Sequence, residues 1–524
     1  MIDKNAYEAL KSIVGPEYIT DDDLICRAYF SGGYGVDSYQ DKGLVRPACV
    51  VLPGDTEEVQ RIVKAANRYK VPLVPASAFW AVLCTPRRPD MVLVDLKRMN
   101  RMEIDEKNMY ALVEPYVIYS QLQAEAFKRG LYALVPGGGG QVSVVANSIF
   151  CSMSPLAYRF GWPTRRLAGV EWVLPTGEIL RLGSSTFAKE YFWCEGPGPD
   201  LRGMLRGALG WCGGLGIVTK VAFKLHPFVP ESPESMGISP HSTLKLPEDR
   251  MRWYNITFPS LERLIEAIYK INKAEIGAAV TSVPNLWRYR AKAESREHFW
   301  EMWPKAEKEI KKAQRILRVL LIGYTSEKQL EYEERVLMDI VAESEGSPRR
   351  TRQTDESWLK NSDAVGMWWV SGGYISMKGN IDTLEHAIQS GKAGAELAKD
   401  FAPPLVEEYG EIGWIQSVDF GHGVYLEFLI NFDPDDDYQT ADQCAIASYK
   451  QDIAQRRYNM FPVMGYGPVG LSGPAYDNYH LMLSKVKRTF DPNNISNPPR
   501  PLDVDEAIEK HCPWIEKDWK TIKL

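Results

Sequence analysis

Residues 71–86 read VPLVPASAFWAVLCTP, and this stretch decides the fold of the first part of the chain. The β-branched run Val71–Val74 predicts a strand, and the apolar run Met91–Leu96 predicts a second strand after the loop. A loop between two such strands presents backbone N–H groups to a bound anion. Such loops usually contain glycine, which reaches φ > 0 and lets the backbone approach a ligand closely. Here the loop has no glycine, and Phe79 and Trp80 stand in its middle.

The residues before this loop predict a compact βαβ unit. Ala48–Leu52 is a short β-branched run, and Pro53–Thr56 supplies a turn and a helix N-cap. Apolar side chains then recur at helical spacing, at Val59, Ile62, Val63 and Ala66. This spacing predicts an amphipathic helix over Glu57–Tyr69 that leads into the strand at Val71.

Composition excludes several classes of function. The chain has 524 residues, 45% hydrophobic and 25% charged, with a formal net charge of −6, so we expect no nucleic-acid partner. No apolar run approaches the ~20 residues that cross a bilayer, and the charged start of the chain does not resemble a signal peptide. The eight cysteines are scattered without a CxxC pair, and the seven histidines are equally dispersed. We therefore expect no metal site and a cytoplasmic location.

The pattern of predicted strands and helices changes after Pro227. Before it, short strands and helices alternate, with a dense glycine run at 136–140. Residues 227–247 are rich in proline and polar residues and predict a linker, and beyond them long helices alternate with strands, which is typical of an antiparallel sheet covered by helices. The last segment has few regular elements, and we expect it to return to the first domain. The predicted fold is α+β, with domains at 1–227, 228–460 and 461–524.

Six further strings stand in order along the chain. They are VLPGDTEEV at 51–59, VDLKRMN at 94–100, YALVEP at 110–115, GVEWVLPTG at 169–177, GLGIVT at 214–219 and DPNNISNP at 491–498. Together they resemble the vanillyl-alcohol oxidase and p-cresol methylhydroxylase (PCMH) family of FAD-linked oxidases. The resemblance implies a PCMH-type FAD-binding domain of two α/β subdomains and an α+β substrate cap with an antiparallel sheet. It also implies that FAD lies between them and accepts hydride at flavin N5 from an alcohol, phenol, amine or hydroxy acid.

The chain departs from the family pattern where that pattern contacts the cofactor. The glycine-rich diphosphate loop stands here as PASAFWA at 75–81, the Glu-Pro-Gly-Val string as EPYV at 114–117, and the second flavin-facing string as VANSIFCSMSP at 145–155. Replacing glycine keeps the N–H donor but disfavours φ > 0 and brings a Cβ toward the ligand. If FAD binds, we expect its diphosphate on N–H groups of Ser77–Ala81 and of the glycine run, with no positive φ in the first loop and with Phe79 and Trp80 turned away. If FAD does not bind, Phe79, Trp80 and Tyr116 should fill its volume.

The resemblance implies a set of cofactor-binding residues in both loops and at the ends of the FAD domain. These are Pro75, Ser77, Ala78, Phe79, Trp80, Gly137, Gly138, Gly139, Gly140, Ser143, Ser148, Ser152, Gly216, Ile217, Val218, Asn497 and Arg500. The serines would donate to phosphate or to flavin edges, and Ile217 and Val218 would flank the adenine. Arg500 would balance charge at flavin N1–C2=O or would only cap a turn. No histidine stands in the diphosphate loop, so the family's common covalent flavin link is not expected there.

Candidate catalytic residues lie in two places. The string DFGHG at 419–423 partly resembles the FGH string of the hydroxy-acid branch of the family and offers His422 and Asp419 as bases. The segment 464–480 offers Tyr466, Tyr476 and Tyr479, which suit a phenol whose hydroxyl is deprotonated through hydrogen bonds. A structural histidine and a packed helix face are the alternatives for these two sets.

Two functions follow from the resemblance and the departures. The first is an FAD-dependent oxidoreductase that passes hydride from a small, aromatic or apolar substrate to flavin N5, with an electron-acceptor protein as a further partner. The second is a flavin-less paralogous subunit that keeps the fold and serves as the structural partner of an active flavoprotein. Both predict a homo- or hetero-oligomer. A lyase or binding protein that reuses the cleft is a third alternative, without a positive signal.

Overall fold

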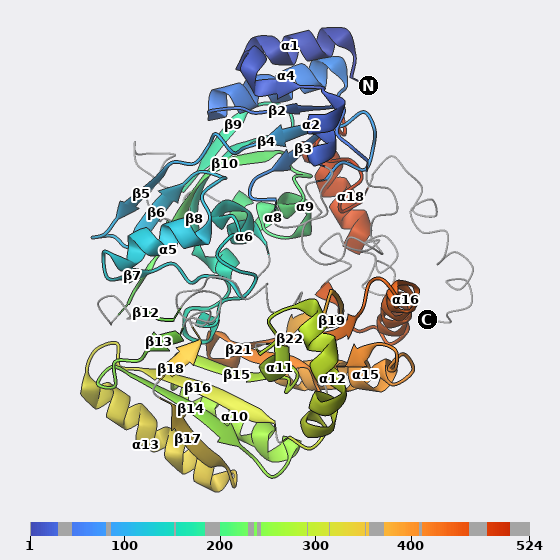
Figure 1. Ribbon diagram of the computed structural model, residues 1–524. Coiled ribbons are helices and arrows are strands. Elements are labelled where there is room, and N and C mark those ends of the chain that lie inside the picture. The colour runs from blue at the N-terminus through green and yellow to red at the C-terminus, as the bar shows by residue number, and fades with distance from the viewer. Residues whose placement is uncertain are drawn as a thin grey trace.

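The computed structural model describes residues 2–29, 45–79, 85–150, 153–183, 200–228, 235–237, 243–290, 292–313, 315–351, 353–355, 371–407, 411–460 and 479–502. Two layered bodies are stacked in Figure 1. The N-terminal half forms the upper body together with α18, and the lower body is a broad sheet with helices on its outer side.

A parallel sheet forms the first subdomain, in the order β1-β2-β4-β3. Strands β2 (Cys49–Val51), β4 (Val92–Asp95) and β3 (Leu73–Ala76) run parallel, and β1 (Ile19–Thr20) pairs antiparallel with β2. The predicted helix is α4 (Thr56–Tyr69), whose N-cap Asp55 accepts a hydrogen bond from the N–H of Glu58. The buried face of α4 packs with α1 (Lys4–Val14) over this sheet, at the top of Figure 1. A third helix, α2 (Asp23–Ala28), lies beside β3.

An antiparallel sheet forms the second subdomain, in the order β5-β6-β10-β8-β9. Its strands are β5 (Met102–Asp105), β6 (Tyr110–Val113), β10 (Ile217–Lys224), β8 (Leu167–Val173) and β9 (Ile179–Leu182). Helices α5 (Tyr119–Phe127) and α6 (Val144–Ile149) share a buried core with this sheet. Four short elements complete this half: β7 (Leu131–Tyr132) pairs with β11 (His226–Pro227), η3 (Pro163–Arg166) lies against α6 and β8, and α7 (Ala157–Phe160) contacts the sheet of the lower body.

The lower body is an antiparallel sheet in the order β17-β14-β16-β15-β21-β22-β19. The strands are β17 (Ser347–Thr351), β14 (Met251–Thr257), β16 (Ile316–Ile322), β15 (Ala279–Val283), β21 (Trp414–Val418), β22 (Gly423–Phe432) and β19 (Gly373–Asp382), with β20 (Val406–Glu407) paired to β22. The helices are α10 (Leu261–Ala274), α11 (Trp287–Arg290), α12 (Arg296–Ile310), α13 (Glu327–Glu343), α15 (Leu384–Ala398) and α16 (Tyr438–Ala454).

The two faces of this cap sheet have different neighbours. Alternate residues of β22 face opposite ways, because side chains alternate along a strand. Leu426 belongs to the core under α10, α13 and α15, whereas Tyr425 and Leu429 belong to a core shared with Leu134, Met153 and other residues of the FAD domain. We call this second side the inner face of the cap sheet.

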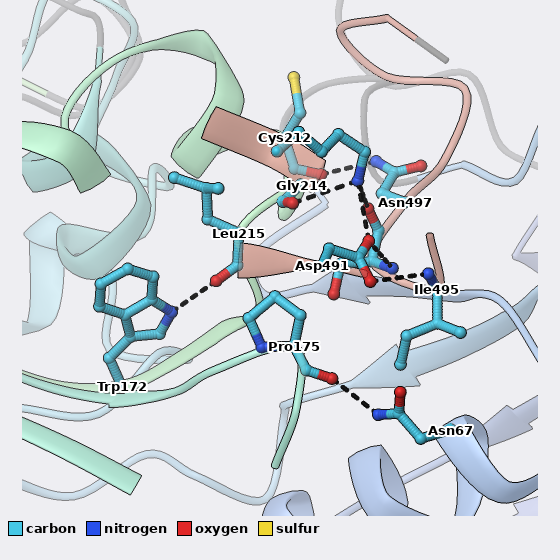
Figure 2. Close-up of polar contacts among 11 residues, drawn as sticks. Asn67, Trp172, Pro175, Cys212, Gly214, Leu215, Asp491, Ile495 and Asn497 are labelled. Atoms are coloured by element: carbon cyan, nitrogen blue, oxygen red, sulfur yellow. Dashed lines mark hydrogen bonds and ion pairs between the residues drawn. The ribbon is translucent and has the colours of Figure 1, made fainter. Parts of the chain in front are cut away.

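The C-terminal segment packs on the FAD domain (Figure 2). After α18 (Tyr479–Phe490), the chain runs beside β3, where the N–H of Leu73 donates to Ile495 O at 2.7 Å and the N–H of Asn497 donates to Leu73 O at 2.8 Å. The ammonium of Lys487 pairs with Asp491 at 3.0 Å and donates to the carbonyl oxygens of Gly214 and Ser496. These contacts attach DPNNISNP to β3 and to the GLGIVT string.

The architecture confirms the predicted fold class, a PCMH-type FAD-binding domain with an antiparallel cap sheet. The domain limits at 227 and 460 stay predictions. Between residues 201 and 211 the chain forms two short helices, α8 (Leu201–Leu205) and α9 (Ala208–Trp211), and not one continuous helix. The break falls at Gly207, whose φ of +118° is incompatible with a continuous helix.

Candidate functional site

The first loop begins directly after β3. Ser77, Ala78 and Phe79 are half-buried, and within the described part of the chain their three N–H groups donate no hydrogen bond. Phe79 has a φ of +52°, so the expectation of no positive φ in this loop is wrong. Its ring packs edge-on against Tyr29 at 5.5 Å and against the core under α2, which offsets the cost of a left-handed non-glycine residue. The ring of Pro75 packs closely against Gly213.

This loop fits a phosphate-bearing cofactor. Its backbone has the left-handed turn that glycine usually supplies, and no described residue accepts a hydrogen bond from the N–H groups of Ser77, Ala78 or Phe79. Ser77, Ala78 and Phe79 would therefore hold the diphosphate of FAD through the backbone. Trp80, which was expected to act with them, lies outside the described residues.

The glycine run has a different role from the one expected. The N–H of Gly137 donates to Met153 O at 2.6 Å, and the N–H of Gly139 donates to Pro136 O at 3.0 Å. A Cβ at Gly137 would stand 3.2 Å from Met153 O and 3.4 Å from the ring of Trp414. Gly137 thus permits the close approach of the cap, and Gly139, with φ +114°, permits the turn. The buried Gly138 and Gly140 complete the run.

The hydroxyl groups of two predicted serines form hydrogen bonds with backbone groups of the chain itself. Ser143 is the N-cap of α6, where it accepts from the N–H of Ala146 and donates to Pro115 O. Ser148 donates to Val144 O at 2.6 Å. Ser152 lies outside the described residues.

The remaining cofactor candidates lie around β10 and the C-terminal segment. Gly216 has a φ of +100°, and a Cβ there would stand 2.3 Å from Val173 O. Ile217 and Val218 are buried in β10 and pair with β8. Asn497 is bonded to Leu73 and to Cys212, and Arg500 is buried near Cys212. Close packing at Gly216 and the hydrogen bonds of Asn497 therefore explain why these residue types stand at these positions.

The inner face of the cap meets the FAD domain at the glycine run. The amide of Gln416 donates to Ser154 O at 2.8 Å and to Pro155 O at 3.0 Å. Beside it, Trp414 stacks obliquely with Trp287 at 5.1 Å and edge-on with Tyr425 at 5.0 Å. An aromatic surface thus faces the second flavin-facing string.

A buried acid stands in the middle of this aromatic surface. Glu427 is paired across the strands with Trp414 and is 5% exposed. It accepts hydrogen bonds from Ser376 at 2.6 Å and from Tyr425 at 2.7 Å. Burial raises the pKa of Glu427, and the hydrogen bonds from Ser376 and Tyr425 and the charge of Arg290 only partly oppose this. A carboxyl group with a raised pKa among aromatic rings has the properties of a general acid or base.

The predicted catalytic residues lie elsewhere or outside the described chain. Asp419 lies in η6 (Asp419–Gly421) at the rim of the cap, where it forms an ion pair with Arg165. His422 follows it and is exposed. Tyr479 opens α18, and Tyr466 and Tyr476 lie outside the described residues. The structure does not bring His422 and Asp419 to Glu427, and the roles of all five stay predictions.

A signal in the sequence could have identified the inner face. The strand GVYLEFLINF at 423–432 is apolar except for Glu427 and Asn431, which are four residues apart and so share one face. Asn431 accepts from the buried Arg290. Polar residues that share one face of an otherwise apolar strand indicate a site, because a buried polar group costs free energy unless it is bonded.

Known proteins share both the FAD domain and the fold. Residues 47–183 match the FAD binding domain family. An uncharacterized FAD-linked oxidoreductase of Mycobacterium tuberculosis is 34% identical over 191 residues, which are 35% of this chain and 38% of that protein. The 4-cresol dehydrogenase flavoprotein subunit of Pseudomonas putida is 30% identical over 193 residues, 35% of this chain and 36% of that subunit. The matches thus span less than half of either relative.

The solved structure of p-cresol methylhydroxylase with bound substrate has the same fold. It superposes with a TM-score of 0.73 over 96% of this chain and 97% of its own, at 17% identity. The fold and site define a flavoprotein with an FAD-binding domain and a cap, and FAD is its cofactor. The matched domain and the shared fold make the chain similar to the vanillyl-alcohol oxidase and p-cresol methylhydroxylase family. Among the described residues, no helix is long and apolar enough to cross a membrane.

Proposed function

We propose that this chain is an FAD-dependent oxidoreductase that removes hydride and a proton from a small aromatic or apolar alcohol, phenol or hydroxy acid. The observation that carries the proposal is the inner face of the cap, where a buried carboxyl group stands among aromatic rings opposite an FAD-binding domain. FAD bound between the two domains would accept the hydride.

Residues of the chain would orient the substrate and accept its proton. Trp414 and Tyr425 offer flat apolar surfaces that orient a ring. Glu427 accepts the proton of the substrate hydroxyl. Its pKa is raised toward neutral pH, which makes the carboxylate a better general base. Tyr425 and Ser376 hold the carboxylate in place by donating to both of its oxygens. His422 is the second candidate for the base.

The flavin-less subunit remains the second candidate function. It is favoured by the internal hydrogen bonds of Gly137, Gly139, Ser143 and Ser148, which withdraw four expected donors from a cofactor. An oligomer with an active flavoprotein or an electron-acceptor protein would then be its working form, and a cytoplasmic location stays part of both proposals.

Anaerobic reduction tests the first proposal. Protein reconstituted with FAD is mixed with a panel of small aromatic alcohols, phenols and hydroxy acids, and the visible absorbance of oxidised flavin is followed. We expect at least one class to bleach the flavin, and Glu427→Gln to slow bleaching by about 10²–10⁴-fold. Ser417→Ala is the matched control on the neighbouring strand. Bound flavin that no substrate bleaches would contradict the proposal.

A further inference from the structure

The DFGHG string forms the turn between two strands of the inner face, β21 and β22. The N–H of His422 donates to Asp419 O at 3.0 Å and closes the turn. The two central residues, Phe420 and Gly421, have φ values of +51° and +87°. Two consecutive left-handed residues between antiparallel strands are typical of a type I′ hairpin turn.

The first central position of this turn holds an unusual residue. Type I′ turns favour Asn, Asp or Gly there, because a positive φ brings the Cβ of a larger residue against the backbone. This chain has Phe420 instead, half-buried, and Asp419 before it is left-handed as well. A bulky residue keeps such a backbone only where contacts from outside the turn hold it.

Those contacts come from α7 of the FAD domain. The ring of Phe420 packs edge-on against Tyr158, with 5.2 Å between the ring centroids, and the guanidinium of Arg159 lies 6.0 Å from the centroid of the Phe420 ring. Tyr158 is fully buried, and its hydroxyl donates to Ile271 O of α10 at 3.2 Å. The ring therefore rests on a fixed surface, which follows directly after the second flavin-facing string.

The same turn joins the strands that carry the candidate site. Strand pairing places Trp414 of β21 opposite Glu427 of β22, and in a hairpin the turn sets this register. Gln416 of β21 donates to two backbone carbonyl oxygens of the FAD domain just before α7. The hairpin is therefore attached to one segment of the FAD domain at two points, through Gln416 in the strand and through Phe420 at its tip.

We propose that Phe420 is a positioning residue whose ring, resting on Tyr158, fixes the tip of the β21–β22 hairpin against the FAD domain. Through the hairpin it sets how Trp414 and Glu427 face the second flavin-facing string. The inference rests on the proposed function, since that function assigns these two residues to the substrate. A displacement of about 1 Å at a reacting group costs up to about 10²-fold in rate, so a contact remote from Glu427 can affect turnover.

Phe420→Asn separates the ring contact from the turn, because it removes the ring and gives the turn the Asn-Gly pair that type I′ turns prefer. Phe420→Tyr keeps the ring. Met109→Gly is the matched control, since Met109 is an exposed left-handed residue, with φ +55°, between β5 and β6. Each protein is labelled with fluorotryptophan, and the fluorine NMR resonance of Trp414, assigned with Trp414→Phe, is recorded. The kcat and KM for flavin bleaching by the substrate found in the panel are then measured.

We expect Phe420→Asn to shift the Trp414 resonance and to lower kcat about tenfold, with KM changed less than about twofold. Its Tm should stay within about 2 °C of the wild type, because the better turn offsets the lost ring contact. Phe420→Tyr and Met109→Gly should match the wild type in resonance, kcat and KM.

A Trp414 resonance in Phe420→Asn that equals the wild type overturns the positioning role and leaves the proposed function standing. A shifted resonance with unchanged kcat also overturns it, because the hairpin then moves without an effect on the reaction. If no substrate bleaches the wild-type flavin, the proposed function fails, and the resonance alone decides whether Phe420 positions the inner face. If Phe420→Asn does not fold, Phe420→Leu, which keeps the apolar volume without the ring, is judged by the same readouts.

Discussion

Lys487 and Arg166 are both fully buried cations of the FAD domain, and their surroundings differ completely. Lys487 has a carboxylate and two carbonyl oxygens around its ammonium, and Asp491 in turn accepts the N–H groups of Ile495 and Ser496 (Figure 2). Within the part of the chain that the structure describes, Arg166 has one carbonyl oxygen and no carboxylate. The first charge is satisfied by the fold itself, whereas the second has no anionic partner among the described residues.

The largest expected effect on the free energy of unfolding is that of replacing Lys487. Lys487→Met leaves the Asp491 carboxylate buried without its cation, so we expect the free energy of unfolding to fall by about 3–5 kcal/mol. Urea denaturation followed by tryptophan fluorescence measures it. Lys485→Met, two residues away and exposed, is the control and should change stability by less than about 0.5 kcal/mol. A loss below about 1 kcal/mol for Lys487→Met would break the comparison.

Two glycines of the FAD domain allow a second comparison, between GLGIVT and the glycine run. At Gly216, a Cβ would stand 2.3 Å from Val173 O at a φ of +100°, so Gly216→Ala should destabilise by about 3 kcal/mol. At Gly137 the nearest atom is 3.2 Å away, and Gly137→Ala should cost about 1 kcal/mol. Thermal unfolding of both variants under one set of conditions gives the order. The reverse order would show that the glycine run is the more constrained segment.

Glu427 makes stability depend on pH in a defined direction. Burial raises its pKa above the usual 4.5. Between pH 4.5 and this raised pKa the folded state binds more protons than the unfolded state, so the free energy of unfolding falls as pH rises. We expect Glu427→Gln to remove this loss, so that its Tm advantage over the wild type grows from pH 4.5 upward by a few degrees. Thermal scans at steps of pH measure the difference. A difference independent of pH would mean that the pKa of Glu427 is the same in the folded and unfolded states, which would contradict the prediction.

Arg166 should behave in the opposite way from Lys487 when no ligand is present. Arg166→Met removes an uncompensated buried charge and keeps most of the apolar volume. We therefore expect flavin-free Arg166→Met to be within about 1 kcal/mol of the wild type or to be more stable. Urea denaturation without phosphate measures this. A loss as large as that of Lys487→Met would place an internal partner at Arg166.

The smallest effect belongs to His422. It is exposed at the rim of the cap, so His422→Ala should change the free energy of unfolding by less than about 0.5 kcal/mol. Turnover of the same variant distinguishes the two candidate bases. A fall of 10²-fold or more with unchanged stability would make His422 the base in place of Glu427.

Local patterns predicted the elements whose signals are short-range. The helix at Glu57–Tyr69 and the strand at Val71 follow from apolar spacing and a cap, and α4 and β3 lie there. The helix α15 was not predicted, because Gly391 and Gly394 interrupt its pattern. Tertiary contact explains Gly391, where a Cβ would stand 2.5 Å from Ile412 O. Single-sequence patterns do not contain such long-range contacts.

The candidate site was predicted less completely, for a related reason. The cofactor loops are contiguous strings, so the resemblance located them, although it did not reveal that Phe79 takes the left-handed turn. The inner face of the cap combines Trp414, Glu427 and Ser376 from three strands. Only the pairing register brings these residues together, and register depends on the assembled sheet.

The central claim is that this chain holds one FAD despite the loss of its loop glycines. The most direct measurement is to reconstitute the purified protein with excess FAD, separate it by gel filtration, and compare flavin and protein absorbance. The account predicts one flavin per chain that co-elutes with the protein. Protein that elutes without flavin, and gives no heat on titration with FAD at micromolar concentration, would contradict it.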